Sequence, residues 1–145
     1  MKEDLRAALD TLPHGPEFRF LDRLTFLEPG RRGSGNYTVR GDELFLRGHF
    51  PGDPLFPGVL LIEAAAQLAG SVAQSDPMLT PLPGLKLTAV RGAKILGSAR
   101  PGEEINLSAE VIGRLDNLVQ TRVSAHVGGI LVLQAELTLS GSKGD

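Results

Sequence analysis

The sequence predicts an α+β domain in which one long apolar helix is wrapped by a curved antiparallel sheet. Three observations support this fold class. One segment, residues 59–74, has the length and the apolar content of a long helix. Much of the remaining chain alternates apolar and polar residues, which is typical of strands with one buried face. Tight turns join the later strands, so these strands are expected to run antiparallel.

The 145 residues suit one domain, and we expect residues 1–145 to fold as a single unit. The first elements are short. Pro13 stops an amphipathic segment, Pro29 and Gly30 end a first alternating run, and the glycine-rich residues 33–35 indicate a turn. The expected elements are a helix over residues 2–12, a strand from Phe18 to Phe26, a strand over residues 36–40 and a short extended piece over residues 44–46.

The segment of residues 48–58 differs from the rest of the chain. Pro51, Pro54 and Pro57 recur every third residue, and each fixes φ and removes an amide donor. We therefore expect a stiff, irregular loop that leads directly into the helix of residues 59–74.

Long strands are expected throughout the second half. Each has roughly ten residues, against a usual ~5–6, and Asp116-Asn117 and Gly128-Gly129 mark tight turns between them. They form an antiparallel meander with one apolar face. The expected strands cover residues 85–95, 105–115, 119–127 and 131–139.

The helix of residues 59–74 is apolar nearly all round, which predicts burial on all or nearly all sides. Its run of small residues, Ala64 to Ala66, lets neighbouring backbones approach closely. Burying such a helix requires a sheet that curves around it, and the long strands can supply one.

Composition excludes several classes of protein. The net charge is −2, which argues against a basic nucleic-acid binder. The absence of cysteine removes disulfides, thiolate nucleophiles and iron–sulfur clusters. The first residues are acidic, unlike a secretory signal, and the apolar stretch 59–73 is too short to span a bilayer. We expect a cytoplasmic protein without membrane insertion.

Glu63 and Gln67 are the polar residues of the helix before Ser71, and their spacing of four places them on one face. A buried carboxylic acid tends to keep its proton, so Glu63 could act as a general acid if this face borders a cavity. The alternative is a polar pair satisfied by internal partners or at a subunit contact.

His49 lies in the proline-rich loop, beside Phe50 and Pro51. A loop histidine is commonly a plain surface residue, but here apolar neighbours would hold the imidazole, which can take a proton near neutral pH. Gly58 and Val59 begin the helix, where the first amides have no internal acceptor. A base, an acid and amide donors together suggest proton abstraction beside a polarised carbonyl, with protonation of a leaving group.

These residues form a recognisable pattern. Gly48-His49-Phe50-Pro51-x-x-Pro54-x-x-Pro57-Gly58-Val59-x-x-x-Glu63-Ala64-x-Ala66-Gln67 closely resembles the signature of the bacterial 3-hydroxyacyl-[acyl-carrier-protein] dehydratases, hot-dog-fold lyases of fatty-acid biosynthesis. Weaker likeness runs from Leu12-Pro13-His14 to Arg100-Pro101-Gly102-Glu103. Gly15-Pro16-Glu17 departs from the family pattern, as do Phe56 and Arg91-Gly92.

The resemblance implies roles for individual residues. His49 would withdraw the C2 proton of a (3R)-3-hydroxyacyl thioester, and Glu63 would protonate the departing hydroxyl. Gln67 would orient Glu63. Gly58 and Val59 would hold the thioester carbonyl, beside Phe50 and Pro57. The family works without a cofactor on chains carried by acyl carrier protein, and its sites form across homodimers that often assemble as trimers of dimers, that is, hexamers.

Two other functions stay open. The departures at Gly15-Pro16-Glu17 motivate a non-catalytic acyl-thioester-binding protein, and a hot-dog thioesterase or a hydratase acting on coenzyme A thioesters is the other alternative. No metal site is expected, because His14, His49 and His126 are far apart and have no ligand partner at helical spacing. The basic residues Arg31, Arg32, Arg91, Lys94 and Arg100 could form a patch for an acidic carrier.

Overall fold

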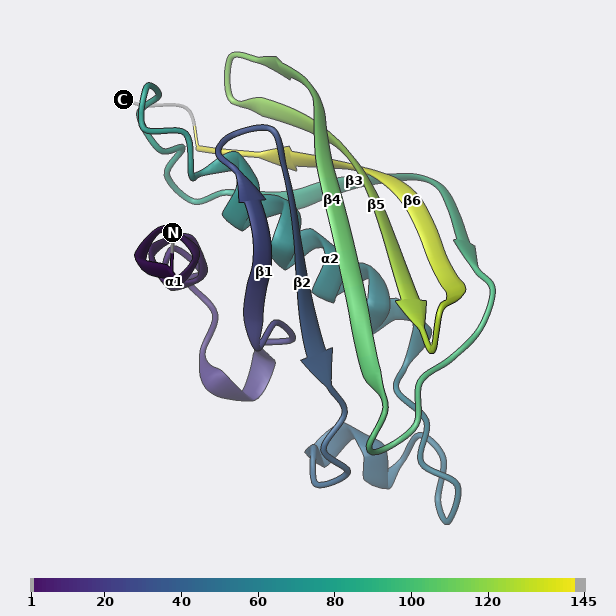
Figure 1. The fold of residues 1–145 in the computed structure, drawn as a ribbon. Helices are drawn as coiled ribbons and strands as arrows, with labels where there is room; N and C mark the ends of the chain where they lie inside the picture. The colour runs from purple at the N-terminus through teal and green to yellow at the C-terminus, as the bar shows by residue number, and fades with distance from the viewer. Residues whose placement is uncertain (1, 143–145) are drawn as a thin grey trace.

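A six-stranded antiparallel sheet curves around one long helix in the computed structural model, which describes residues 2–142 (Figure 1). The strand order is β1-β2-β4-β5-β6-β3, so the chain crosses from one side of the sheet to the other through helix α2. The elements are α1 (Lys2–Asp10), η1 (Pro16–Phe18), β1 (Arg23–Glu28), β2 (Arg32–Thr38), η2 (Leu44–Arg47), α2 (Gly58–Ala73), β3 (Lys86–Ile95), β4 (Glu104–Leu115), β5 (Leu118–Val127) and β6 (Ile130–Ser140).

The four long strands of the second half are present, and β4, β5 and β6 form the predicted meander, because strict alternation leaves one register that buries the apolar face. The predicted place of the first of them is wrong: β3 pairs with β6 at the edge of the sheet instead of with β4, and almost all of its side chains are exposed. In β5, buried and more exposed side chains alternate along most of the strand. The two predicted turns are also present. Asp116 adopts a φ of 54° between β4 and β5, and Gly128 and Gly129 adopt φ values of 57° and 79° between β5 and β6.

The predicted turn at residues 33–35 is wrong. These residues lie inside β2, paired with β1 on one side and β4 on the other. Gly33 and Gly35 allow close packing rather than a turn: a Cβ at Gly35 would lie 2.7 Å from the carbonyl oxygen of Arg23, and one at Gly33 would lie 2.9 Å from Val72. The chain reverses earlier, at Gly30, whose φ is 73°.

Two further predictions for the first half need correction. The strand expected from Phe18 begins only at Arg23, because Pro16 to Phe18 form a short 3₁₀ helix. The extended piece expected at residues 44–46 is also a 3₁₀ helix, η2. The N-terminal helix is confirmed and ends at Asp10.

Helix α2 is confirmed within one residue at each end, and its buried side is packed against the sheet. Burial on every side is not observed. Val59 is 68% exposed, whereas Leu61, Leu68 and Val72 are fully buried. The helix therefore has an outer side that the sheet does not cover, and Glu63 lies on it. Among the described residues, no helix is long and apolar enough to cross a membrane.

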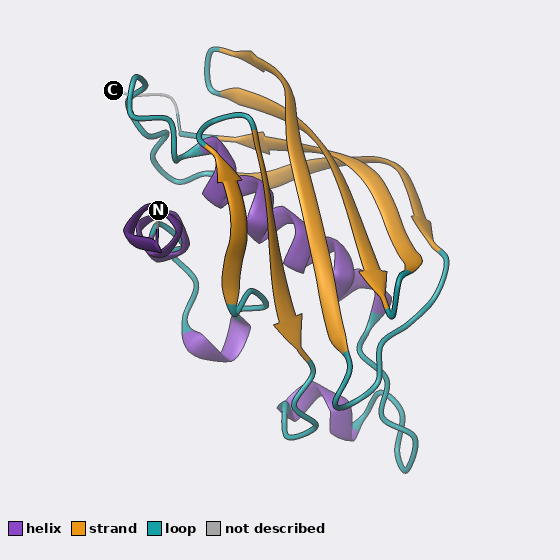
Figure 2. Cartoon of the chain, viewed as in Figure 1, coloured by secondary structure: helices purple, strands orange, loops and turns teal. Residues whose placement is uncertain are grey.

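The β2–α2 connection, which contains the proline-rich loop, lies at one end of the sheet (Figure 2). It contacts the β3–β4 connection there. Phe56 N donates to the Ala99 carbonyl at 2.8 Å, and Val39 N donates to the Glu103 carbonyl at 3.0 Å. These bonds fix the loop of residues 48–57 relative to the sheet.

Candidate active site

An aromatic cluster holds both ends of the loop that carries His49. Phe45 precedes the loop in η2 and Phe56 follows it, and their ring centroids are 5.6 Å apart. Both rings also pack edge-on against Phe20, at 5.8 and 5.7 Å. Tyr37 of β2 completes the cluster at 5.7 Å from Phe20 and from Phe56. Contacts of this geometry stabilise a fold beyond their buried area, so the loop has two rigid attachment points.

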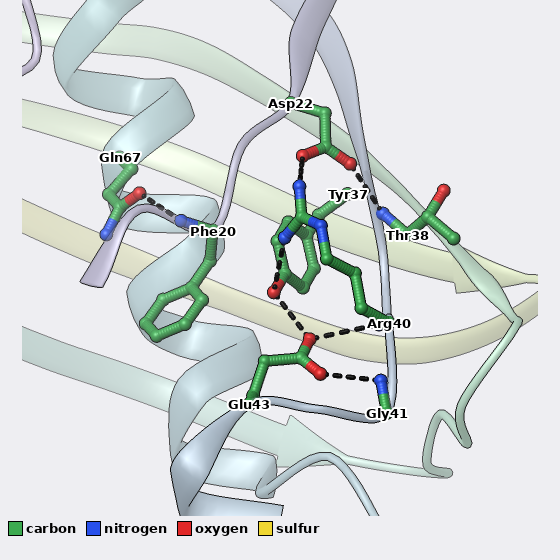
Figure 3. Close-up of polar contacts among 8 residues, drawn as sticks. All are labelled: Phe20, Asp22, Tyr37, Thr38, Arg40, Gly41, Glu43 and Gln67. Atoms are coloured by element: carbon green, nitrogen blue, oxygen red, sulfur yellow. Dashed lines mark hydrogen bonds and ion pairs between the residues drawn. The ribbon is translucent and has the colours of Figure 1, made fainter. Parts of the chain in front are cut away.

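A polar network adjoins this cluster at the hydroxyl of Tyr37 (Figure 3). The Tyr37 hydroxyl donates to Glu43 Oε2 at 2.6 Å, and Gly41 N donates to Glu43 Oε1 at 2.7 Å. Arg40 pairs with Asp22 at 2.8 Å, and Asp22 also accepts from the backbone amide of Thr38. The network joins the end of β2 to the start of η2, the segment that leads to His49.

Burial opposes ionisation of Glu43, but the hydrogen bonds donated by Tyr37 and by the amides of Arg40 and Gly41 outweigh it and lower the pKa of Glu43. Burial, together with the bond to Glu43, raises the pKa of Tyr37 well above its usual range. The network is therefore strongest with an ionised carboxylate and a neutral phenol.

His49 is held in one orientation. Its Nδ1 lies 2.8 Å from the Leu55 carbonyl oxygen, and its ring stacks on Phe50 with centroids 4.2 Å apart. A carbonyl can only accept, so in the neutral imidazole this contact assigns the proton to Nδ1. Nε2 is then the unprotonated nitrogen. The loop closes on itself through the bond from Leu55 N to the His49 carbonyl at 2.7 Å.

The first turn of α2 presents unsatisfied amides. Pro57 occupies the N-cap position and makes no side-chain capping bond. Its carbonyl accepts from Leu60 and Leu61, whereas the amides of Gly58 and Val59 precede the first intrahelical bonds. Gly58 has no side chain because Ile95 occupies that space: a Cβ would lie 3.0 Å from Ile95 Cδ1.

Glu63 and Gln67 share one face of α2, as the spacing predicts. Gln67 is 2% exposed and makes three hydrogen bonds. Its Oε1 accepts from Phe20 N at 2.8 Å, and its Nε2 donates to the Phe18 carbonyl at 2.9 Å and to Glu63 Oε2 at 3.0 Å. The first of these bonds is drawn in Figure 3. Because both ends of the amide are engaged by the backbone, Gln67 is a fixed support for the Glu63 carboxyl.

His14 also contacts Glu63, and the sequence reasoning did not identify it as a site residue. His14 Nε2 lies 3.4 Å from Glu63 Oε2, the same oxygen that Gln67 contacts. Its Nδ1 is buried and has no hydrogen-bond partner within the described part of the chain. Among the residues that the structure describes, none supports Glu63 Oε1 in this way, so it is the oxygen left to face a substrate. The sequence feature that could have indicated His14 as a site residue is the segment Leu12-Pro13-His14, which resembles the corresponding segment of the family.

A cleft of about 710 Å³ opens beside Glu63, as expected for a face that borders a cavity. It contains Glu63, Gln67 and His14 and extends between the end of α1 and the start of β3. His49, Phe50, Pro57, Gly58 and Val59 are not among the residues that line it. Within one copy of the chain, the described residues therefore place Glu63 in this cleft and the loop that carries His49 outside it.

The basic residues do not gather in one place. Arg32, Arg91 and Lys94 line a hollow of about 1060 Å³ on the outer face of the sheet, together with Arg122. Acidic side chains alternate with them there: Arg122 lies 3.6 Å from Glu110 and 3.5 Å from Glu136. Arg31 and Arg100 do not line this hollow; they pair with Glu28 and with Asp53 respectively. A single patch of all five basic residues is therefore not formed.

Comparison with protein families gives a match over most of the chain. A family model described as a FabA-like domain matches residues 12–136. Relatives named 3-hydroxyacyl-[acyl-carrier-protein] dehydratase FabZ include one from Thiobacillus denitrificans, 34% identical over 92% of this chain and 94% of that protein. Another, from Geotalea uraniireducens, is 36% identical over 92% of this chain and 93% of that protein.

Solved structures share the fold at low sequence identity. The dehydratase heterocomplex ApeI:P from Xenorhabdus doucetiae superposes with a TM-score of 0.77 at 16% identity, over 93% of this chain and 91% of that chain. An HP0420 homologue from Helicobacter felis gives a TM-score of 0.70 at 13% identity, over 97% of this chain and 91% of that chain. The predicted hot-dog fold is confirmed.

Proposed function

Because the chain belongs to the FabA-like family, with relatives named 3-hydroxyacyl-[acyl-carrier-protein] dehydratase, we propose that it removes water from (3R)-3-hydroxyacyl thioesters on acyl carrier protein. The product is a trans-2-enoyl thioester, as used in fatty-acid biosynthesis. The observation that carries this proposal is the pair of oriented groups, His49 with a free Nε2 and Glu63 fixed through one oxygen.

His49 is the proposed base. Its Nε2 takes the proton from C2 of the substrate, while the Nδ1–H bond to the Leu55 carbonyl stabilises the imidazolium that forms. The stacked Phe50 ring keeps the imidazole from rotating away. The electron pair of the broken C2–H bond then moves toward the thioester carbonyl.

Glu63 is the proposed acid. With one oxygen held by Gln67 and His14, its protonated carboxyl gives its proton to the 3-hydroxyl. The C3–O bond breaks, water leaves, and the C2=C3 double bond forms. The proton taken by His49 and the proton given by Glu63 balance, so the reaction needs no oxidant, reductant or cofactor.

The amides of Gly58 and Val59 are the proposed donors to the thioester oxygen, on which negative charge develops as C2 loses its proton. They lie at the positive end of the α2 dipole and have no acceptor inside the helix. Donors already in place need no rearrangement during the reaction. Phe50 and Pro57 would border the substrate at this point.

A homodimer is the proposed functional unit. Strand β3 is at the edge of the sheet, and almost all of its side chains are exposed. Val90 and Ile95 are 46% and 47% exposed, and an unpaired apolar edge strand favours pairing with a second copy. Such a dimer could bring His49 of one copy to Glu63 of the other, which is consistent with their separation within one chain. Sedimentation would distinguish a dimer from a trimer of dimers.

The carrier protein is proposed to approach the basic end of the outer face. Arg91 and Lys94 lie on the edge strand β3, where Arg91 is the cross-strand partner of Glu136 and Lys94 that of Gln134. Replacing Arg91 and Lys94 with Glu should lower turnover of carrier-linked substrates more than that of short thioester mimics. The reason is that basic side chains attract the acidic carrier protein, whereas the short mimics carry no such protein. Equal loss on both substrates would contradict this placement.

The activity is tested with purified protein and a 3-hydroxyacyl thioester. The proposal predicts the conjugated enoyl product, and His49→Ala or Glu63→Gln should each lower the rate by a factor of ~100 or more. Release of free thiol instead would indicate a thioesterase. Binding of the thioester without turnover would indicate the non-catalytic alternative.

A further inference from the structure

Tyr37 of β2 contacts the chain on both sides of His49. Its ring is 1% exposed in the aromatic cluster and lies 5.7 Å from the ring of Phe56, near the end of the proline-rich loop. Its hydroxyl donates at 2.6 Å to Glu43, the residue that precedes η2 (Figure 3). One side chain therefore joins the segment before His49 to the segment after it.

The Glu43 carboxylate holds the turn between β2 and η2 together. Its Oε2 accepts from Arg40 N at 3.1 Å as well as from Tyr37, and its Oε1 accepts from Gly41 N at 2.7 Å. The guanidinium of Arg40 donates to the same Tyr37 hydroxyl at 3.2 Å. The hydroxyl is thus the polar atom through which this turn is attached to the buried cluster.

The position of η2 determines the position of the His49 backbone. His49 N donates to the Leu46 carbonyl at 3.3 Å, and Leu46 N donates to the Glu43 carbonyl at 3.0 Å. These bonds connect the backbone from Glu43 to His49 turn by turn. A shift of Glu43 would therefore also move the imidazole.

The contact that orients the imidazole spans the two ends of the loop. His49 Nδ1 belongs to the end held by η2, whereas its partner, the Leu55 carbonyl, belongs to the other end. Leu55 precedes Phe56, whose amide donates to the Ala99 carbonyl at 2.8 Å and whose ring lies in the aromatic cluster. Movement of η2 relative to the cluster would therefore separate Nδ1 from its acceptor.

From these contacts we infer that Tyr37 is a positioning residue for His49: its hydroxyl holds η2 against the aromatic cluster, and η2 holds the imidazole at the Leu55 carbonyl. The role of His49 as the base rests on the proposed function. Tyr37 does not line the cleft beside Glu63, and its hydroxyl is engaged within the network. Its effect is therefore indirect. A catalytic group displaced by ~1 Å can lose ~100-fold in rate even when the substitution lies far from the reacting atoms.

Thr121 offers a matched control. Its hydroxyl is fully buried and donates to the Leu137 carbonyl at 3.0 Å, which joins β5 to β6 and makes no contact with the His49 loop. Tyr37→Phe and Thr121→Val each remove one hydroxyl and keep the shape of the side chain. Both variants lose a hydrogen bond and some stability, but only Tyr37→Phe loses the attachment of η2.

The kinetic test compares these two variants with the wild type on a 3-hydroxyacyl thioester. Tyr37→Phe should lower kcat at least ~tenfold and change KM less than ~twofold, because the base moves while the residues that bind the thioester stay in place. Thr121→Val should change neither constant more than ~twofold. In a His49→Ala background, Tyr37→Phe should change the residual rate less than ~twofold, since no imidazole is left to position.

The ring nitrogens of His49 give a second readout that needs no turnover. In protein with isotope-labelled histidine, the signals lost in His49→Ala identify this ring in the NMR spectrum. The wild type should show one neutral tautomer, protonated at Nδ1, because the Leu55 carbonyl can only accept. Tyr37→Phe should add a second population protonated at Nε2, and Thr121→Val should not.

A Tyr37→Phe protein that matches Thr121→Val both in kcat and in the His49 ring signals would overturn the inference. If Tyr37→Phe does not fold, Glu43→Gln replaces it with the same expected changes, because one carboxylate oxygen becomes an NH₂ group that cannot accept. A wild type without turnover would contradict the proposed function. The ring signals would then decide the positioning role alone: a second tautomer in Tyr37→Phe would support it, and an unchanged ring would overturn it.

Discussion

Replacing Gln67 with leucine should impair stability and activity together, because this one side chain supports the backbone and the catalytic acid. Leucine has a similar size but leaves Phe20 N, a buried donor, without its 2.8 Å acceptor, and leaves the Phe18 carbonyl without its donor. An unsatisfied buried donor costs about 1–3 kcal/mol, and the more exposed Phe18 carbonyl adds less. We expect a loss of roughly 2–3 kcal/mol in the free energy of unfolding.

For a chain of this length that loss corresponds to a fall in Tm of roughly 4–12 °C. Urea denaturation gives the free energy, and thermal denaturation followed by circular dichroism gives Tm. The matched variant is Glu63→Gln, which removes the acid but keeps every contact between Gln67 and the backbone, so its Tm should stay close to that of the wild type. An unchanged Tm in Gln67→Leu would refute the view that Gln67 is a fixed support.

The remaining predictions concern the network, the sheet and His14. The lowered pKa of Glu43 adds stability that is fully present above its ordinary value of 4.5 and is lost as the pH falls below it. Glu43→Gln should therefore destabilise the protein at pH 7 and progressively less in acid, as urea unfolding at several pH values would show; an equal loss at every pH would exclude this linkage. Gly35→Ala should cost about 1–3 kcal/mol through crowding against Arg23, whereas Gly113→Ala, whose Cβ would lie 3.9 Å from its nearest neighbour, should be near neutral. His14→Ala should lower kcat about fivefold with little change in KM, since it removes one weak contact to Glu63 worth ~1 kcal/mol; an unchanged kcat would remove His14 from the site.

Strands β4, β5 and β6 were predictable because alternation over ten or more residues leaves a single face to bury, whereas the pairing of β3 with β6 depends on the path of the chain around the sheet. The first half was less so. Gly33 and Gly35 read as a turn in sequence, yet they serve as close-packing positions whose neighbours, Val72 and Arg23, are set by the tertiary structure. Leu44 to Leu46 are too few residues to separate a strand from a 3₁₀ turn by periodicity.

The candidate site likewise contains some features that local sequence predicts and others that depend on the tertiary structure. Glu63 and Gln67 belong to one helix, so their spacing alone placed them on one face. The contact of His14 with Glu63 joins residues far apart in the chain, and no local pattern predicts it. The tautomer of His49 also depends on a tertiary feature, the return of the loop that brings the Leu55 carbonyl to Nδ1.

We propose that His49 of one copy and Glu63 of another form each site. Mixing His49→Ala and Glu63→Gln chains in equal amounts, with unfolding and refolding to exchange subunits, tests it most directly. Random pairing makes half of the dimers hybrid, each with one complete site of two, so activity should return to about a quarter of the wild-type value. Activity that stays at the level of the separate variants would contradict the shared site.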